Sequence, residues 1–371
     1  MKLERLIISC GGTGGHFFPG LSIARTFRKQ GGEVMLLLSG VNAQSQAQCA
    51  ENFRIKAVAL PVMPSWKRKP LAFLRGLFRG YRESVQTVKE FSPQAVLGMG
   101  SFAMTPVLLG ALKCHVPVFL HDGNARIGRG NRIFSRWAKL LGAGFPAVNG
   151  DKCRCRVSDV GMPVRPELLE CAGISRKEAL DKLNAAFGCE LKEENTTILI
   201  FGGSQGAAVF NSVLPQALKA CGAQDIQVLH LCGKGKKVET EKLYSDAAFP
   251  VLLLESSDRM EYFLGSADAV FSRSGGSTLA ELALFGKGAF LIPYPYAAEG
   301  HQQDNAEYFE RNGAALVIGN EDFSVEKAVE LLNNEVCAGN GKLAERGMAA
   351  KQLARPDASL RMLEEISAII G

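Results

Sequence analysis

The chain has 371 residues, of which 47% are hydrophobic and 22% charged, so it is neither disordered nor a collagen-like or disulfide-stapled miniature protein. At roughly 100–200 residues per domain, its length predicts two domains. The net charge of +6 is too small to indicate nucleic acid, and we expect no nucleic-acid partner.

The ten cysteines do not have the pattern of a disulfide framework. Several lie in or beside apolar runs, and the chain begins with a strand-like segment instead of a signal peptide, so we expect reduced thiols in a cytoplasmic protein. Cys153 and Cys155 lack a second pair of ligands nearby, so we expect no metal site. No apolar run approaches the ~20 residues that span a bilayer.

Short apolar runs alternate with amphipathic stretches, which predicts an α/β fold with parallel sheets. In the first half, the predicted strands cover residues 6–9, 34–38, 95–97 and 116–120. In the second half, they cover residues 197–201, 227–231, 251–254, 269–271 and 289–292. Because each half begins with a strand, a glycine-rich turn and a helix, we expect two doubly wound, Rossmann-like domains facing one another across a cleft.

The domain boundary is expected near residues 161–166, where Pro163 and Pro166 interrupt regular structure. We therefore divide the chain into domains of residues 1–162 and 163–342. A final helix over residues 343–371 is expected to pack back on the first domain.

Glycine-rich turns follow the first strand of each predicted domain, at residues 11–15 and 202–206. Such turns bring backbone N–H groups close to an anion at the positive end of a helix. A tight turn without a ligand is the alternative for each turn, but the occurrence of two favours anion binding. Neither turn has the spacing of a dinucleotide fingerprint or the ending of a P-loop, which argues against NAD enzymes and kinases.

A third glycine-containing loop covers residues 272–281 and allows two interpretations. Thr278 and Glu281 fit a capping box, which needs no ligand. Alternatively, the helix N-terminus lies under a pyrophosphate, and the Glu281 carboxylate accepts hydrogen bonds from a ribose diol. The polar loop at residues 293–306 follows the next strand, at the edge where open parallel sheets bind ligands.

Taken together, these motifs resemble the MurG family, which comprises GT-B glycosyltransferases of peptidoglycan synthesis. The resemblance rests on residues 11–20, 98–102, 121–124, 202–206 and 273–275, in the family's order. It implies transfer of N-acetylglucosamine from UDP-N-acetylglucosamine to undecaprenyl-pyrophosphoryl-N-acetylmuramoyl-pentapeptide, which converts lipid I to lipid II. No cofactor is implied.

The resemblance also assigns roles to individual positions. The first domain would present the lipid acceptor and face the membrane, and the second would bind the UDP-sugar. The residues expected near the donor sugar are Thr13, Gly14, Gly15 and Asn124. UDP would be held by Arg165, Ser204, Gly276, Ser277, Thr278, Leu279, Ala280, Glu281 and either Gln302 or Gln303, with the uracil edge near Ser257.

The chain departs from the family pattern in two places. The family's usual His-Glu-Gln-Asn is replaced here by residues 121–124 with the sequence His-Asp-Gly-Asn, which removes an amide and shortens a carboxylate. An acidic residue that commonly precedes the His-Gln pair is Gly300 here. These differences leave the fit of the donor open.

Inverting sugar transfer needs a base for the acceptor hydroxyl and stabilisation of the charge that develops on the diphosphate. Helix-end amides and the Arg165 guanidinium are expected to supply the second without a metal. His16 follows the first glycine turn, and free histidine has a pKa near ~6.5, which suits a base, so we favour His16 as the base. Asp122 is the alternative base, or it orients an imidazole. His121 is expected to be a structural partner in its loop and His230 an ordinary core residue.

Residues 66–82 are basic and apolar, with six basic residues and no acidic one. This pattern predicts a helix on an anionic membrane surface, where each basic side chain contributes about 1 kcal/mol. The resemblance implies that this surface is the cytoplasmic face of the inner membrane, where the lipid acceptor would lie. A surface helix with its apolar face in the core is the alternative. Both hold if Leu71 and Leu74 pack inward while three other apolar residues stay exposed: Trp66, Phe73 and Leu77.

Other functions remain open from the sequence. The chain fits another membrane-associated UDP-sugar transferase with a different lipid acceptor, or a catalytically silent subunit that binds a nucleotide sugar. A UDP-sugar epimerase shares the two-domain plan, but it would not need a basic, lipid-facing segment.

Overall fold

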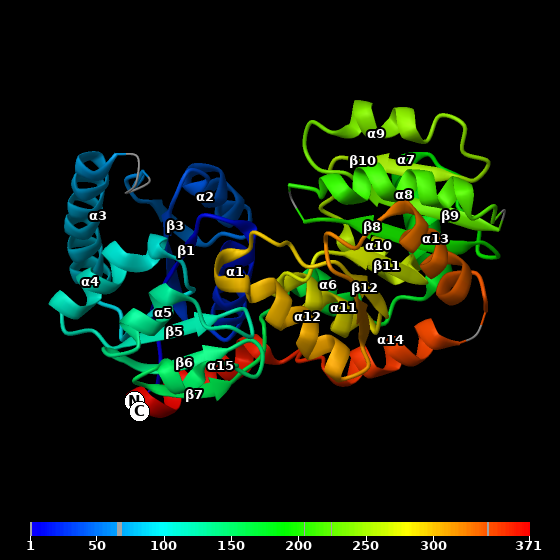
Figure 1. Ribbon diagram of the computed structural model, residues 1–371. Coiled ribbons are helices and arrows are strands. Elements are labelled where there is room, and N and C mark those ends of the chain that lie inside the picture. The colour runs from blue at the N-terminus through cyan, green and yellow to red at the C-terminus, as the bar shows by residue number, and fades with distance from the viewer. Residues whose placement is uncertain (1, 65–68, 204, 224, 340) are drawn as a thin grey trace. The chain divides into compact units, whose positions relative to one another are not determined.

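The computed structural model describes residues 2–64, 69–203, 205–223, 225–339 and 341–371, which form two α/β units (Figure 1). The first unit comprises Met1–Arg165 and Arg355–Gly371, and the second comprises Pro166–Ala354. Each unit contains one sheet in which neighbouring strands run parallel. The predicted fold class of two doubly wound α/β domains is confirmed.

The first unit is built on a seven-stranded sheet. Its strands are β1 (Arg5–Gly11), β2 (Glu33–Ser39), β3 (Lys56–Ala59), β4 (Ala95–Gly98), β5 (Val118–Asp122), β6 (Ala138–Ala143) and β7 (Arg156–Asp159). Its helices are α1 (Gly14–Lys29), α2 (Ala43–Asn52), α3 (Pro70–Phe91), α4 (Thr105–Lys113), α5 (Arg129–Phe134) and α15 (Ala358–Ile370), with short turns η1 (Phe102–Met104) and η2 (Gly150–Lys152). The strand order β3-β2-β1-β4-β5-β6-β7 reverses the direction of winding between β1 and β4.

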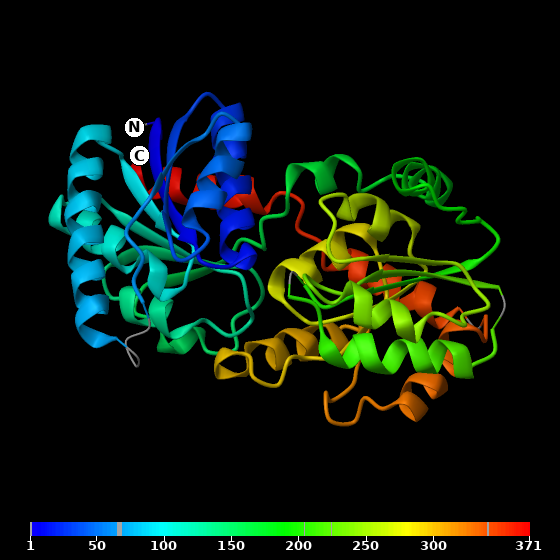
Figure 2. The same cartoon turned by 90° about the horizontal axis from the view of Figure 1, so that it is seen from above.

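Helices cover both faces of this sheet, because the residues of its central strands are apolar and buried (Figure 2). On one face, α1, α2 and α15 bury side chains such as Phe17, Ala47 and Met362. On the other face, α3 and α4 bury side chains such as Val88 and Leu108. A parallel sheet covered in this way leaves its strand ends for ligands.

The second unit repeats the plan with six strands. The strands are β8 (Thr196–Phe201), β9 (Ile226–Leu231), β10 (Val251–Leu254), β11 (Ala269–Ser272), β12 (Ala289–Leu291) and β13 (Ala315–Val317). The helices are α6 (Pro166–Glu170), α7 (Arg176–Phe187), α8 (Ala208–Ala220), α9 (Lys237–Leu243), α10 (Met260–Ser266), α11 (Gly276–Phe285), α12 (His301–Arg311), α13 (Val325–Leu331) and α14 (Lys342–Gln352), with short turns η3 (Ala298–Gly300) and η4 (Leu332–Val336). The order β10-β9-β8-β11-β12-β13 reverses between β8 and β11.

All nine predicted strands are present, and four further strands, β3, β6, β7 and β13, were not predicted. The strand predicted at residues 116–120 is β5, which begins at Val118. The shift follows from Pro117, which has no N–H group for the ladder and so precedes the strand.

The segment predicted as one helix over residues 343–371 forms two helices, α14 and α15. Pro356 lies between them, and the residue before a proline disfavours helical backbone angles, so one continuous helix cannot run through Arg355. In the structure, α14 belongs to the second unit, whereas α15 packs against α1 and β6 of the first.

The basic helix α3 is oriented differently from our expectation. Leu71 is 81% exposed and Leu74 is 48% exposed, whereas Phe73 and Leu77 are half-buried. The condition under which both interpretations of this segment would hold, with the two leucines packed inward, is therefore not met. Trp66, the third residue expected to stay exposed, lies outside the described residues.

Small residues explain the orientation of α3. The buried stripe of this helix is Gly76, Gly80 and Ser84, and a Cβ at Gly76 would lie 2.8 Å from the Val62 carbonyl oxygen. A Cβ at Gly80 would lie 3.3 Å from Pro106 in α4. The glycine side of α3 therefore approaches its neighbours closely, and Leu71, Leu74 and Phe78 in its first half project outward, whereas Val88 and Phe91 near its end are buried.

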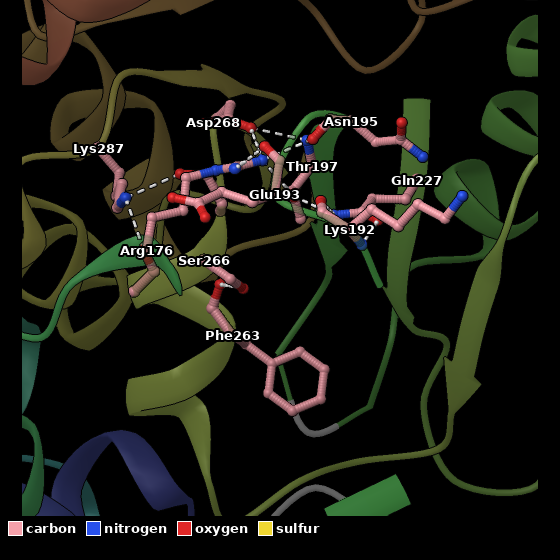
Figure 3. A network of polar contacts seen from close by, with 12 residues as sticks. Arg176, Lys192, Glu193, Asn195, Thr197, Gln227, Phe263, Ser266, Asp268 and Lys287 are labelled. Atoms are coloured by element: carbon pink, nitrogen blue, oxygen red, sulfur yellow. Dashed lines mark hydrogen bonds and ion pairs between the residues drawn. The ribbon is translucent and has the colours of Figure 1, made fainter. Parts of the chain in front are cut away.

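A polar network joins the amino ends of β8 and β11 (Figure 3). Arg176, the first residue of α7, donates to the carbonyls of Glu193 and Asn195 at 2.5 Å each and to Asp268 Oδ2 at 2.8 Å. The same Asp268 oxygen accepts from the Thr197 backbone N–H at 2.7 Å. One guanidinium thus bonds acceptors at the ends of several segments.

Within the described residues, no helix is both long and apolar enough to cross a bilayer.

Candidate active site

The first glycine turn connects β1 to α1 and requires glycine at its start. Gly11 has φ +122°, and a Cβ there would lie 2.7 Å from the Ser39 carbonyl oxygen. The helix then begins at Gly14 after Thr13, and Thr13 and Gly15 are exposed. Because the first N–H groups of a helix have no intrahelical acceptors, this exposed end can bind an anion.

His16 lies where two turns of the first unit meet. Its Nδ1 is 3.1 Å from Thr13 Oγ1 in its own turn. On the other side is the turn after β4, where a Cβ at Gly100 would lie 3.3 Å from His16 Cδ2. Gly100 has φ +89°, so this close approach uses a backbone conformation that favours glycine. The imidazole is half-buried and held next to the carboxyl ends of β1 and β4.

Asp122, at the carboxyl end of β5, organises the following loop. Its Oδ2 accepts from the Gly128 N–H at 2.8 Å and from Asn131 Nδ2 at 2.9 Å. Its Oδ1 accepts from the backbone N–H and the side-chain amide of Asn124 at 3.2 and 3.4 Å. A carboxylate that accepts from four donors is suited to holding Asn124 and Asn131 in place.

His121 is buried beside this loop, and its Nε2 lies 3.0 Å from the Gly161 carbonyl oxygen. A carbonyl only accepts, so Nε2 carries a proton and donates. Burial lowers the pKa of His121, which favours the neutral ring. Asn131, which the sequence analysis did not single out, donates to both the His121 carbonyl and Asp122. The sequence signal for Asn131 is weak, since it is one of three polar residues in a six-residue helix.

Arg165 is the last residue of the first unit, although the sequence analysis assigned it to the second domain. Its guanidinium lies 5.4 Å from the centre of the Phe18 ring in α1, within cation–π distance. Arg165 therefore lies next to the first turns of α1.

In the second unit, the glycine turn after β8 includes Gly203 at φ +79° and Gly206 at φ +64°. Ser204, a predicted UDP contact, lies outside the described residues. The turn leads into α8, which begins at Ala208.

The loop after β11 leads directly into α11, which begins at Gly276 with Gly275 as its N-cap. Thr278 is therefore inside the helix, so the capping-box interpretation is wrong. Ser277 and Thr278 lie four and three residues before Glu281, so all three share one helix face.

Some side chains of this loop and helix start are buried in the core, and two serine hydroxyls have no hydrogen-bond partner in the described part of the chain. Leu279 is buried, which leaves only its backbone for a ligand, and Ala280 is half-buried. Within the described part of the chain, the hydroxyl oxygens of Ser272 and Ser277 are buried and have no hydrogen-bond partner. A buried polar atom without a partner costs about 1–3 kcal/mol. Ser272 has no exposed surface, whereas Ser277 is partly exposed, so Ser277 is the candidate ligand contact.

The loop after β12 is tied to the loop after β11. Arg273 donates to the carbonyls of Ile292 and Pro293 at 2.9 and 3.1 Å. Its guanidinium also lies 5.2 Å from the Phe210 ring and 5.5 Å from the Tyr294 ring. Burial lowers the pKa of Arg273, but an arginine stays charged.

The two predicted glutamines differ in their surroundings. Gln302 Oε1 accepts from the Tyr294 N–H at 2.9 Å, and the Gln302 carbonyl accepts from Ser274 Oγ at 2.7 Å. Gln303 is exposed and donates to Glu307 along the outer face of α12 at 3.1 Å. The structure therefore brings Gln302, but not Gln303, to the loops after β11 and β12. Asn305, which we did not predict, also joins them by donating to the Ser274 carbonyl at 2.9 Å.

Ser257 follows β10, and its Oγ accepts from the Arg259 N–H at 3.1 Å. Three strand spacings separate β10 from β11, which is about 14 Å. The predicted contacts in the second unit therefore extend along one edge of the sheet, from β10 through β8 and β11 to β12.

The metal-ligating residue types do not gather at either edge. Within the described residues, no group of three or more His, Cys, Asp or Glu side chains is arranged to hold a metal ion.

Comparisons with known proteins decide the family. Residues 6–142 match the glycosyltransferase family 28 N-terminal domain, and residues 197–362 match its C-terminal domain. The chain is 31% identical, over 99% of both chains, to the UDP-N-acetylglucosamine–N-acetylmuramyl-(pentapeptide) pyrophosphoryl-undecaprenol N-acetylglucosamine transferase of Desulforamulus reducens. The chain belongs to the MurG family of glycosyltransferases. It is therefore a glycosyltransferase, as the sequence motifs predicted.

Solved structures agree with this membership. MurG of Acinetobacter baumannii is 26% identical and superposes with a TM-score of 0.75 over 98% of this chain and 99% of that one. A UDP-GlcNAc 2-epimerase from Neisseria meningitidis, 14% identical with a TM-score of 0.68 over 98% of this chain and 99% of that one, shares the fold alone.

The two positions that depart from the MurG pattern, Gly123 and Gly300, differ in the space that a side chain would find there. A Cβ at Gly123 would lie 2.7 Å from Met162 Sδ, so the buried Met162 occupies the space of a side chain there. A Cβ at Gly300 would meet no described atom within 4 Å, but Gly300 has φ +71° as the N-cap of α12. A side chain at the first position needs the end of Met162 to move, and the second position is constrained by its backbone.

Proposed function

We propose that the protein transfers N-acetylglucosamine from UDP-N-acetylglucosamine to the 4-hydroxyl of N-acetylmuramoyl-pentapeptide on undecaprenyl pyrophosphate. The reaction inverts the anomeric carbon and converts lipid I to lipid II in peptidoglycan synthesis. The observation that carries the proposal is the similarity to MurG transferases along the whole chain.

In this proposal, the second unit binds the donor. The diphosphate lies against the amides at the starts of α8 and α11, with Ser204, Gly276 and Ser277 beside it. Glu281 accepts hydrogen bonds from the ribose, Gln302 contacts the sugar or diphosphate, and the backbone near Ser257 reads the uracil edge. The strand order supports this arrangement, because ligands bind at the switch point of an open sheet.

The first unit supplies the acceptor side and the base. His16 takes the proton of the acceptor hydroxyl, while Thr13, Gly14, Gly15 and Asn124 line the sugar site. The position of His16 between two glycine turns supports this role. We assign Asp122 to holding the Asn124 loop, because its carboxylate already accepts hydrogen bonds from four donors.

Departure of UDP leaves negative charge on the diphosphate. The N-terminal amides of α8 and α11 and the Arg165 guanidinium stabilise that charge in the transition state, where such groups act most strongly. Sugar transfer by these groups needs no redox or covalent step from the protein.

We further propose that α3 holds the protein on the anionic cytoplasmic face of the inner membrane, where its lipid acceptor lies. Leu71, Leu74 and Phe78 are all exposed along one side of α3. Arg75, Arg79 and Arg82, at helical spacing beside them, are also exposed. An exposed apolar stripe flanked by cations suits the boundary between acyl chains and anionic headgroups. Of the segment 66–82 that we assign to this contact, residues 66–68 lie outside the described residues.

The transfer proposal is tested with purified protein, labelled UDP-N-acetylglucosamine and a short-chain lipid I analogue. Transfer of label to the lipid is expected. Release of UDP without acceptor would favour an epimerase or hydrolase, and binding without either reaction would favour a silent nucleotide-sugar subunit. Transfer to a different lipid but not to the analogue would indicate another acceptor.

The membrane proposal is tested by vesicle co-sedimentation. The wild-type protein is expected to bind anionic vesicles at low salt and to bind neutral vesicles weakly. Replacing Leu71, Leu74 and Phe78 by serine should abolish binding, whereas Leu360→Ser, which changes an exposed leucine on α15, should not. Equal binding to neutral and anionic vesicles would refute the electrostatic part of the proposal.

A further inference from the structure

A buried chain of hydrogen bonds connects β9 to the first turn of α8. His230, in β9, is fully buried, and its Nδ1 lies 3.0 Å from the Tyr244 hydroxyl. Its Nε2 lies 3.0 Å from Asn211 Oδ1 in α8. Asn211 Nδ2 in turn donates to the Cys232 carbonyl at 2.9 Å. The predicted role of His230 as an ordinary core residue does not account for this chain of polar contacts.

The chemistry of the groups fixes the direction of every bond in this chain. The Cys232 carbonyl only accepts, so the Asn211 NH₂ group must face it and Asn211 Oδ1 must face His230. An amide oxygen also only accepts, so His230 Nε2 carries the proton and donates. Nδ1 is then the acceptor, and the Tyr244 hydroxyl donates to it.

The chain keeps the same protonation under all ordinary conditions. Burial lowers the pKa of His230 to about 3 and raises the pKa of Tyr244, so both groups remain neutral. Because each polar atom of the chain has its partner, the chain can be buried without the cost of unmade hydrogen bonds.

The Cys232 end of the chain supports the glycine turn after β8. A Cβ at Gly206 would lie 2.0 Å from the Cys232 carbonyl oxygen, and a Cβ at Gly233 would lie 2.5 Å from the Gln205 carbonyl oxygen. Lys236 Nζ also donates to the Gln205 carbonyl at 2.8 Å. The backbone of residues 232–233 therefore touches residues 205–206 with no space between them, and a shift of one moves the other.

We propose that His230 and Tyr244 are positioning residues for the backbone of Gln205 and Gly206 in the glycine turn after β8, acting through Asn211 and the Cys232 carbonyl. This inference rests on the proposed function, in which that turn and the start of α8 bind the diphosphate of the donor. Both side chains are buried, so they hold the turn in place without touching the ligand. Asn211 ties the first turn of α8 to the same carbonyl that Gly206 contacts.

The test compares His230→Phe with a change at the other end of the same strand. Phenylalanine keeps a ring in place but makes neither hydrogen bond. We expect the UDP Kd, measured by calorimetry, to rise about tenfold, and the KM for UDP-N-acetylglucosamine to rise likewise, since Kd changes tenfold for each 1.4 kcal/mol. We expect kcat to fall by less than threefold, because the base and the acceptor site are unchanged.

Gln227→Met is the matched control. Gln227 is also buried in β9, but its side chain bonds Lys192 and Thr197 at the amino end of the strand. We expect this variant to lose thermal stability while its UDP Kd stays within twofold of wild type. If its Kd rises as much as that of His230→Phe, the effect is general loosening of the unit and the inference is overturned.

A second variant keeps the test decisive if His230→Phe does not fold. Tyr244→Phe removes only the donor to Nδ1, so the ring keeps its Nε2 bond to Asn211 but loses the contact that holds its other side, and we expect the UDP Kd to rise about threefold. An unchanged Kd in the folded variants overturns the inference alone. If wild-type protein fails to bind UDP, the proposed function fails and the inference falls with it.

Discussion

In each sheet, the edge formed by the amino ends of the strands (the amino edge) and the edge formed by their carboxyl ends (the carboxyl edge) are used in different ways. At the amino edges, side chains satisfy the backbone: Gln94 accepts from the Glu4 and Arg5 N–H groups in the first unit, and Arg176 joins several segments in the second (Figure 3). At the carboxyl edges, glycine-containing turns follow β1, β8 and β11, and α1 and α11 begin without side-chain caps. The same strands are thus fastened at one end and exposed to ligands at the other. Stability and chemistry should therefore respond to different mutations.

The largest expected effect is at the carboxyl edge of the first unit. His16→Ala should lower kcat by about 10²–10⁴-fold, the usual contribution of a general base, while the UDP Kd stays within twofold. Steady-state kinetics and calorimetry measure the two quantities separately. Near-normal turnover in this variant would eliminate His16 as the base.

Asp122→Asn is the companion variant. If the carboxylate holds its loop, the loss should appear as lower thermal stability together with lower activity, because the Gly128 and Asn131 donors lose a charged acceptor. Loss of kcat at unchanged stability would instead support Asp122 as the base.

The next effect is at the amino edge of the second unit. Arg176→Met removes the bonds to Asp268 and to two carbonyls from a side chain that is only 25% exposed. We expect the free energy of unfolding to fall by about 2 kcal/mol, as measured by urea denaturation. The UDP Kd should not change.

Lys177→Met is the control, since Lys177 is the exposed neighbour of Arg176. It should leave both stability and UDP binding unchanged. An altered UDP Kd in Arg176→Met would show that the amino edge also affects ligand binding. This result would contradict the division between an amino edge that stabilises the unit and a carboxyl edge that binds the ligand.

A smaller effect is expected for Ser277→Ala at the carboxyl edge. The Ser277 hydroxyl has no partner among the described residues, so its loss should not lower Tm. If it donates to the diphosphate, the KM for the donor should rise about fivefold, the equivalent of about 1 kcal/mol. Ser274→Ala, which removes a bond to the Gln302 carbonyl, should lower Tm instead.

The smallest effect is a pH dependence at the amino edge. Lys287 Nζ donates to the Gly265 and Ala267 carbonyls, and burial lowers the pKa of Lys287. Between that lowered pKa and the ordinary lysine value near ~10.4, the unfolded chain binds more protons, so the Lys287 contribution to stability rises with pH. Denaturation curves of wild type and Lys287→Met should therefore diverge as the pH rises, and parallel curves would contradict this.

The sequence predicted the strands whose runs are apolar and buried on both faces. It did not reveal β3 and β7, because edge strands are partly exposed and carry polar residues such as Lys56 and Asp159. For α3, the sequence pattern was misleading, since the large apolar residues suggested the packing face, whereas Gly76 and Gly80 form it. Small residues allow close approach but give no hydrophobic signal.

For the candidate site, glycine turns could be located from the sequence because their composition is unusual. Their mutual contacts could not, since the approach of Gly100 to His16 and the bond from Ser274 to Gln302 join residues far apart in the chain. The His230 chain was missed for the same reason. A histidine in an apolar strand carries no sign of its partners on α8 and beyond α9.

The contact between Gly123 and Met162 has a consequence for chimaeric enzymes. Grafting the usual His-Glu-Gln-Asn segment onto this chain would introduce a glutamine at position 123, where its Cβ alone would collide with the Met162 thioether. Because the thioether is the far end of a flexible side chain, a graft of residues 121–124 should require Met162 to change its rotamer, and a smaller residue at position 162 should ease the exchange. The two positions, 39 residues apart in the chain, are therefore coupled.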